Sequence, residues 1–209
     1  MISSLIRAVT LFVCCGPLLA WAEKPVLLVL GDSLSAAYNI DPARSWPQLL
    51  QARLPEYQLV NRSISGATTA QGLALLPDSL KHHKPAIVLL ELGANDGLQG
   101  KPVGLIEDNL NQLILQAKSQ GSQVLLIGIR LPPNLGKRYT ESFYALYPRL
   151  AQRHQVPWVP FLLERVATDN NLMQADGLHP KAEAQEQVLA NIWPHLAPLV
   201  VAKDVKAAH

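Results

Sequence analysis

Cysteine is scarce in this chain of 209 residues, which contains two copies, Cys14 and Cys15. Both lie within the first 22 residues, so the rest of the chain offers no thiol for a disulfide, a nucleophile or a cysteine-based metal site. We therefore expect a fold that depends on its hydrophobic core for stability.

Charged and aromatic side chains are also sparse. Charged residues make up 16% of the sequence, aromatic residues make up 6%, and the formal net charge is +2. A nucleic-acid-binding protein normally carries a strongly basic face, which this balance does not favour. Hydrophobic residues make up 49% of the chain, too many for a disordered protein. The length suits one globular domain.

The first 22 residues have the pattern of an export signal. Arg7 is the only charged residue before Glu23, an apolar run follows it, and Ala20-Trp21-Ala22 has small residues where a signal peptidase reads. An uncleaved membrane anchor would need about 20 apolar residues. We expect a cleaved signal peptide at 1–22 and a single domain at 23–209 with a loose tail at 203–209. The protein would then be periplasmic or secreted, with no stable membrane anchor.

Five apolar runs bounded by Gly, Pro, Asn or Asp predict buried strands. Their hydrophobicity hardly alternates, which is typical of strands covered on both faces. The runs are Val26–Leu30, Tyr57–Asn61, Ala86–Glu91, Gln123–Ile129 and Val156–Phe161.

Amphipathic segments between these runs predict helices. They are Ser45–Arg53, Thr68–Leu80, Ile106–Gln120, Thr140–His154 and Pro180–Leu196. We expect Pro77 to split the second helix and Pro194 to kink or end the last, because proline removes a backbone donor. The alternation predicts an α/β fold, a flavodoxin-like three-layer α/β/α arrangement around a five-stranded parallel sheet of order 2-1-3-4-5.

Ser33 follows the first predicted strand and is a candidate nucleophile. A serine hydroxyl needs a base within hydrogen-bond reach and a third group that orients the base. Asp176 and His179 stand three residues apart near the other end of the chain, so the carboxylate can accept from one ring nitrogen while the other faces Ser33. Taken singly, Ser33 and Asp176 could each be no more than a helix cap.

Gly66 and Asn95 follow the second and third predicted strands. In the expected strand order, their loops flank the loop of Ser33. The backbone N–H groups of Ser33 and Gly66 and the Asn95 side-chain amide could then point at one oxyanion. Each of the two is otherwise an ordinary turn residue.

Four sequence blocks carry these residues: Gly31-Asp32-Ser33-Leu34-Ser35, Gly66, Gly93-Ala94-Asn95-Asp96 and Asp176-Gly177-Leu178-His179-Pro180. In order and spacing they resemble the SGNH (GDSL-type) hydrolases, and within that family the exported thioesterase/lysophospholipase/arylesterase group of Gram-negative bacteria. The resemblance implies the SGNH hydrolase fold, with Ser33 as nucleophile, His179 as base and Asp176 as its orienter. It also implies an oxyanion hole of Ser33, Gly66 and Asn95.

The resemblance further implies a serine esterase or thioesterase that hydrolyses acyl esters and thioesters, such as lysophospholipids, acyl-CoA and aryl esters. We expect a monomer that needs no metal or organic cofactor and binds no nucleic acid. Apolar side chains in the loops after the third and fourth strands are candidates to bind the acyl chain. They are Leu98, Leu131, Pro132 and Pro133.

Three other functions stay open. A carbohydrate (acetyl) esterase could use the same triad, although it would favour a polar cleft lined by aromatic residues. A peptidase could also use the triad, and a catalytically inactive binding module could share the fold. A nucleotide-binding protein is disfavoured, because the chain has no Gly-x-Gly-x-x-Gly or Walker-type loop.

Four charged residues near these motifs lie outside the expected triad and oxyanion hole. We expect Asp32 and Asp96 to fix loop backbones rather than act as acids. Glu91 would be a strand-end charge with an unidentified partner. Arg130 would either stabilise the rim of the site or attract an anionic head group.

Overall fold

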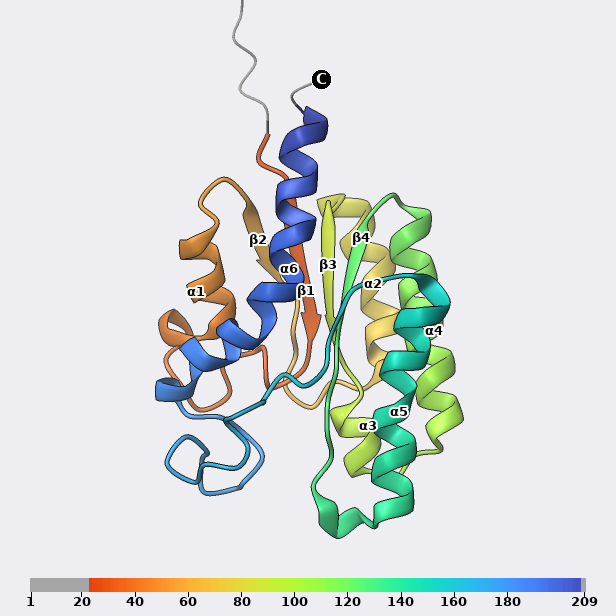
Figure 1. Ribbon diagram of the computed structural model, residues 1–209. Helices are drawn as coiled ribbons and strands as arrows, with labels where there is room; N and C mark the ends of the chain where they lie inside the picture. The colour runs from red at the N-terminus through yellow and green to blue at the C-terminus, as the bar shows by residue number, and fades with distance from the viewer. Residues whose placement is uncertain (1–22, 208–209) are drawn as a thin grey trace, which may run out of the picture.

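The computed structural model describes residues 23–207, with side chains described as far as Val200 (Figure 1). The expected signal peptide at 1–22 therefore lies outside the described residues. In the part of the chain that is described, no helix is long and apolar enough to cross a membrane.

A five-stranded parallel sheet forms the centre of the molecule. Its strands are β1 (Val26–Gly31), β2 (Gln58–Asn61), β3 (Ile87–Glu91), β4 (Gln123–Ile127) and β5 (Trp158–Val159). The order is β2-β1-β3-β4-β5, so the predicted fold class and strand order are confirmed. The parallel register aligns Leu28 of β1 with Val60 of β2 and with Val88 of β3. All carboxyl ends consequently lie at one edge of the sheet.

Helices cover both faces of this sheet (Figure 1). On one face α1 (Trp46–Arg53) packs against α6 (Gln185–Ala207). On the other, α4 (Val103–Ser119) lies between α2 (Thr69–His83) and α5 (Lys137–His154). Shorter helical segments are α3 (Ala94–Leu98), η1 (Pro42–Arg44), η2 (Pro133–Leu135) and η3 (Ala182–Ala184).

Proline does not divide the helices as expected. Pro77 lies inside a continuous α2, so the prediction of a split was wrong. A capping box of Thr68 and Gln71 fixes the start of α2, and its buried apolar face offsets the roughly 3 kcal/mol cost of an internal proline. Pro194 does not end α6, because the helix continues through Pro198 to Ala207. The ribbon of α6 is visibly bent along its length (Figure 1).

Two chain segments also differ from the expectations at their ends. Residues Lys203–Ala207 belong to α6 rather than to a loose tail, and the last two residues lie outside the described part. The fifth strand pairs with β4 over Trp158–Val159 alone, because Pro157 and Pro160 on either side of the pair have no N–H to donate to a neighbouring strand.

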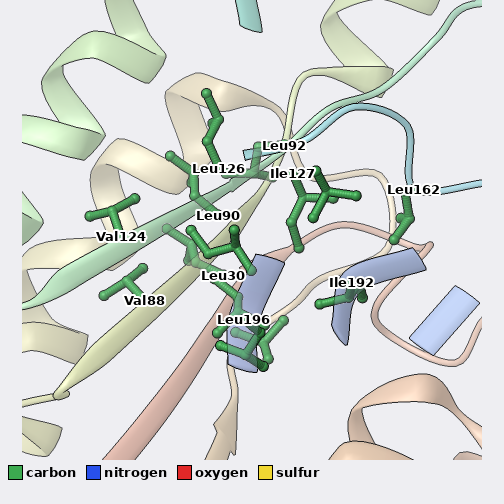
Figure 2. Close-up of a cluster of buried hydrophobic side chains, with 14 of the residues drawn as sticks. Leu30, Val88, Leu90, Leu92, Val124, Leu126, Ile127, Leu162, Ile192 and Leu196 are labelled. Atoms are coloured by element: carbon green, nitrogen blue, oxygen red, sulfur yellow. The ribbon is translucent and has the colours of Figure 1, made fainter. Parts of the chain in front are cut away.

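The hydrophobic core lies between the sheet and its helices. Leu30, Leu90 and Leu126 come from three neighbouring strands and meet Ile192 and Leu196 of α6 (Figure 2). All of these side chains are buried. This packing fixes the positions at which β1, β3 and β4 end, and therefore the loops that follow them.

Two buried acids interrupt this apolar interior at the carboxyl edge. Glu91 ends β3, and its Oε2 accepts hydrogen bonds from Ser35 Oγ at 2.7 Å and from the Asp32 N–H at 3.2 Å. These groups are the partners that the sequence left unidentified. Asp32 lies next to the end of β1, and its Oδ1 accepts from the N–H of Leu34 at 3.0 Å.

Both carboxyl groups hold their protons more tightly than usual. Burial is the main cause that raises the pKa of Asp32 from 3.8 to about 6, against the opposing effect of the Leu34 N–H. Burial also raises the pKa of Glu91 well above 4.5, and the negative charge of Asp32 raises it further. Glu91 is therefore neutral in the folded protein at a pH where the unfolded chain has already lost the proton.

We predict that Glu91, because it keeps its proton in the folded state, lowers the free energy of unfolding increasingly as the pH rises. Above about pH 4.5 the unfolded state gains from ionising Glu91, and the folded state does not. Relative to Glu91→Gln, the wild-type free energy of unfolding should fall by up to about 1.4 kcal/mol per pH unit. Urea denaturation of both proteins between about pH 5 and about pH 8 measures the difference in their unfolding free energies.

The comparison with the variant removes other titrations from the measurement. Burial lowers the pKa of His154 and of His195, and these groups add stability as the pH rises in both proteins. A difference in unfolding free energy that stays constant with pH would show that Glu91 ionises normally in the folded state.

Candidate active site

A cavity of about 260 Å³ opens at the carboxyl edge of the sheet. Most of the residues that the sequence singled out line it: Ser33, Gly66, Asn95, Leu98, Leu131, Pro132 and His179. Asp176 lies behind His179 and does not line the cavity. Pro133 does not line it either, because it begins the short helix η2 instead.

The turn after β1 positions Ser33. The carbonyl of Asp32 accepts hydrogen bonds from the N–H groups of Ser35 and Ala36, which closes the turn around Ser33. Residue 31, just before this turn, is a glycine, because a Cβ at that position would lie 2.7 Å from Glu91 Oε2. The buried acids therefore determine the path of the backbone that presents Ser33.

A second turn positions His179. Asp176 Oδ1 accepts from the N–H groups of Leu178 and His179, at 2.9 and 3.1 Å. Gly177 has a φ of 68°, a left-handed conformation that glycine adopts without strain. The backbone N–H of Gln174 donates to the His179 carbonyl at 2.8 Å, which closes the loop on itself.

The two turns meet in one chain of hydrogen bonds. Asp176 Oδ2 lies 2.7 Å from His179 Nδ1, and His179 Nε2 lies 2.8 Å from Ser33 Oγ. The structure thus joins three side chains whose outer members are 143 residues apart, as the sequence predicts.

The charge of Asp176 sets the direction of these bonds. Burial raises the pKa of Asp176, but hydrogen bonds from the Leu178 N–H and from His179 outweigh it, and the pKa lies below 3.8. An ionised carboxylate only accepts, so Nδ1 of a neutral His179 carries the ring hydrogen. Nε2 then accepts from the Ser33 hydroxyl, which is the arrangement that a serine nucleophile requires.

Backbone donors lie next to Ser33. In the described part of the chain, the N–H groups of Ser33 and Gly66 donate to no protein acceptor, and both residues line the cavity. Gly66 has a φ of 82°, which favours glycine at this place. These two N–H groups are free to bind an oxygen atom of a ligand.

Asn95 lies at the same edge but is already engaged. Its Nδ2 donates to Asp32 Oδ2 at 3.1 Å and to the carbonyl of Ala67 at 3.0 Å. An amide nitrogen has two hydrogens, so Asn95 can serve a ligand oxygen only by sharing one of them. Asp32 holds Asn95 and Asp96 Oδ2 accepts from the Thr69 N–H at 2.7 Å, so both acids fix loops as expected.

The cavity wall is largely apolar. Besides the expected residues, it includes several that the sequence analysis missed: Leu34, Tyr38, Ser65, Ala94, Ile129, Phe161, Leu163 and Leu178. Phe161 and Leu163 follow the fifth strand, so the rule that sites form at carboxyl ends of strands could have found them. Arg130 also lines the cavity, with its guanidinium 3.9 Å from the centre of the Tyr144 ring.

Metal ligands do not gather in this region. Among the residues that the structure describes, no group of three or more His, Cys, Asp or Glu side chains is arranged to hold a metal ion.

Comparisons with known proteins give one consistent result. The model of the GDSL-like lipase/acylhydrolase family matches residues 29–187. The chain is 47% identical to the esterase TesA of Pseudomonas aeruginosa over 183 residues, which are 86% of this chain and 91% of that protein. It is 45% identical to the thioesterase 1/protease 1/lysophospholipase L1 of Escherichia coli K12 over 180 residues, 86% of each chain.

The solved structures agree with these sequence matches. A crystal structure of TesA superposes with a TM-score of 0.81 at 48% identity, and the match covers 83% of this chain and 99% of the other. Since the family model spans most of the chain and relatives of similar length share nearly half of its residues, the chain belongs to the GDSL-like lipase/acylhydrolase family.

Proposed function

We propose that this protein is a serine esterase and thioesterase that hydrolyses lipid-like acyl esters and thioesters. The observation that carries the proposal is the hydrogen-bonded chain Asp176–His179–Ser33, at 2.7 and 2.8 Å, opening onto an apolar cavity. The names of its relatives, an esterase and a thioesterase/lysophospholipase, support the same reaction class.

The proposed mechanism begins at Ser33. His179 Nε2 takes the hydroxyl proton while Oγ attacks the carbonyl carbon of the substrate. Negative charge develops on the carbonyl oxygen, and the free N–H groups of Ser33 and Gly66 stabilise it, with a shared hydrogen of Asn95 as a third donor. Asp176 stabilises the imidazolium that forms.

The leaving group then departs with a proton from His179. An alcohol or thiol is released, and the acyl group remains as an ester on Ser33 Oγ. His179 next takes a proton from water, whose oxygen attacks the acyl-enzyme through the same oxyanion site. Hydrolysis frees the carboxylic acid and returns the proton to Ser33, so the cycle uses amino acid side chains, backbone N–H groups and water.

The cavity favours an acyl chain over a sugar. Its wall carries Leu98, Leu131, Phe161 and Leu163, which suit the burial of hydrocarbon. Lysophospholipids, acyl-CoA and aryl esters are the proposed substrate classes. Export through residues 1–22 would place the activity in the periplasm, where lipid esters are available.

The proposed function is tested by measuring the hydrolysis of p-nitrophenyl esters whose acyl chains have about two to about sixteen carbons, because an apolar site should distinguish these lengths. We expect wild-type turnover that favours medium or long chains, and a loss of at least about 1,000-fold in Ser33→Ala. Ser119→Ala, on the exposed end of α4, is the matched control and should retain full activity.

Two results would contradict this assignment. Turnover that persists in pure Ser33→Ala would exclude Ser33 as the nucleophile. Activity confined to acetyl esters would keep the nucleophile but favour a carbohydrate or small-ester substrate.

A second prediction concerns the acyl site. Leu98→Ala removes apolar surface from the cavity wall, so kcat/KM should fall about 3- to 10-fold for a twelve-carbon ester and less than about twofold for an acetyl ester. Leu105→Ala, on the exposed face of α4 outside the cavity, is the control. Equal losses on both substrates would show that Leu98 does not contact the chain.

A further inference from the structure

Tyr38 lies over the imidazole ring of His179. The two ring centres are 4.3 Å apart and the planes are tilted by 35°. Asp176 and Ser33 contact the His179 ring at its nitrogen atoms, which lie in the ring plane. Tyr38 is placed against a face of the ring and therefore limits a movement that the two hydrogen bonds leave free.

The core does not explain this position of Tyr38. Tyr38 is 39% exposed, and among the described residues the one hydrogen bond to Tyr38 is at its backbone carbonyl, from Gln174, and not at its hydroxyl. An exposed tyrosine without a hydroxyl partner contributes little to folding. Besides lining the cavity, Tyr38 places its ring face against His179.

The backbone around Tyr38 is held in an uncommon conformation. Ala37 and Asn39, on either side of it, have φ values of 57° and 54°. Alanine rarely adopts this left-handed region, and such outliers concentrate at functional sites.

Gln174 connects the Tyr38 loop to the His179 loop. Its Nε2 donates to the carbonyl of Tyr38 at 3.0 Å and to that of Pro180 at 3.1 Å. Its backbone N–H donates to the carbonyl of His179. One residue thus fixes the backbone of Tyr38 relative to the backbone of the proposed base.

We propose that Tyr38 is a positioning residue that acts through His179. Its face keeps the imidazole in the plane that joins Asp176 to Ser33. When His179 takes the serine proton, the ring becomes a cation, and an aromatic face attracts a cation that lies over it. Tyr38 therefore stabilises the protonated base that forms during attack and deacylation. This inference rests on the proposed function.

Three substitutions separate the ring face from the hydroxyl and from bulk. Tyr38→Phe keeps the face, Tyr38→Leu keeps much of the bulk without it, and Tyr38→Ala removes both. We expect kcat on a p-nitrophenyl ester to fall about 3- to 30-fold in the Leu and Ala variants. KM should change less than about twofold. The Phe variant should stay within about twofold of wild type.

The pH profile supplies a readout that a purely structural role would not change. Because the aromatic face favours the protonated ring, the acidic limb of kcat/KM should move to lower pH in the Leu and Ala variants and stay in place in the Phe variant. The nearby charged groups Asp32 and Asp176 are the same in every variant. Leu115→Ala, an exposed truncation on α4, controls for the loss of surface apolar area.

Several results would overturn the inference. A rise in KM at constant kcat would show that Tyr38 contacts substrate instead. Full activity in Tyr38→Leu would show that bulk suffices, and a defect in Tyr38→Phe would assign the effect to the hydroxyl. Wild-type turnover that Ser33→Ala abolishes, together with an unaffected Tyr38→Ala, would contradict this inference and leave the proposed function intact.

Discussion

The parallel pairing of β1 with β3 is the constraint on which the candidate site depends. It aligns Gly31 with Glu91, so both strands end side by side at one edge of the sheet. Ser33 follows β1 and Asn95 follows β3. Asp32 joins the two loops by accepting a hydrogen bond from the Asn95 side-chain amide. Packing of Leu30 and Leu90 in the core fixes where these strands end.

The buried acids show how this edge is stabilised at a cost. Glu91 sits in a fully buried position and accepts from the Asp32 N–H and the Ser35 hydroxyl, which holds the turn that carries Ser33. Burial keeps the pKa of Glu91 high, so this residue lowers the free energy of unfolding near neutral pH while it holds the turn in place. Burial also raises the pKa of Asp32, which accepts a hydrogen bond from Asn95.

Much of the architecture follows from local pattern. The apolar runs predict the five strands, because strands covered on both faces are hydrophobic along their length. The alternation of these strands with helices predicts a doubly wound sheet, for which 2-1-3-4-5 is a common strand order. The effect of the prolines could not be predicted in this way. Pro77 and Pro194 lie in helices that continue past them, since the packing of α2 and α6 against their neighbours outweighs the local penalty.

The sequence by itself determined the fold class, and it predicted the edge of the sheet at which the candidate site lies and the candidate residues Ser33, Gly66, Asn95, Asp176 and His179. These predictions rest on apolar runs and short turns, which are local features of the sequence, and on the strand order common to doubly wound sheets. Only the tertiary structure decided that Glu91 is fully buried, that both Asn95 amide hydrogens are engaged, and that Tyr38 covers His179. Such contacts join side chains from distant loops, and their distances arise only when the sheet and helices pack together.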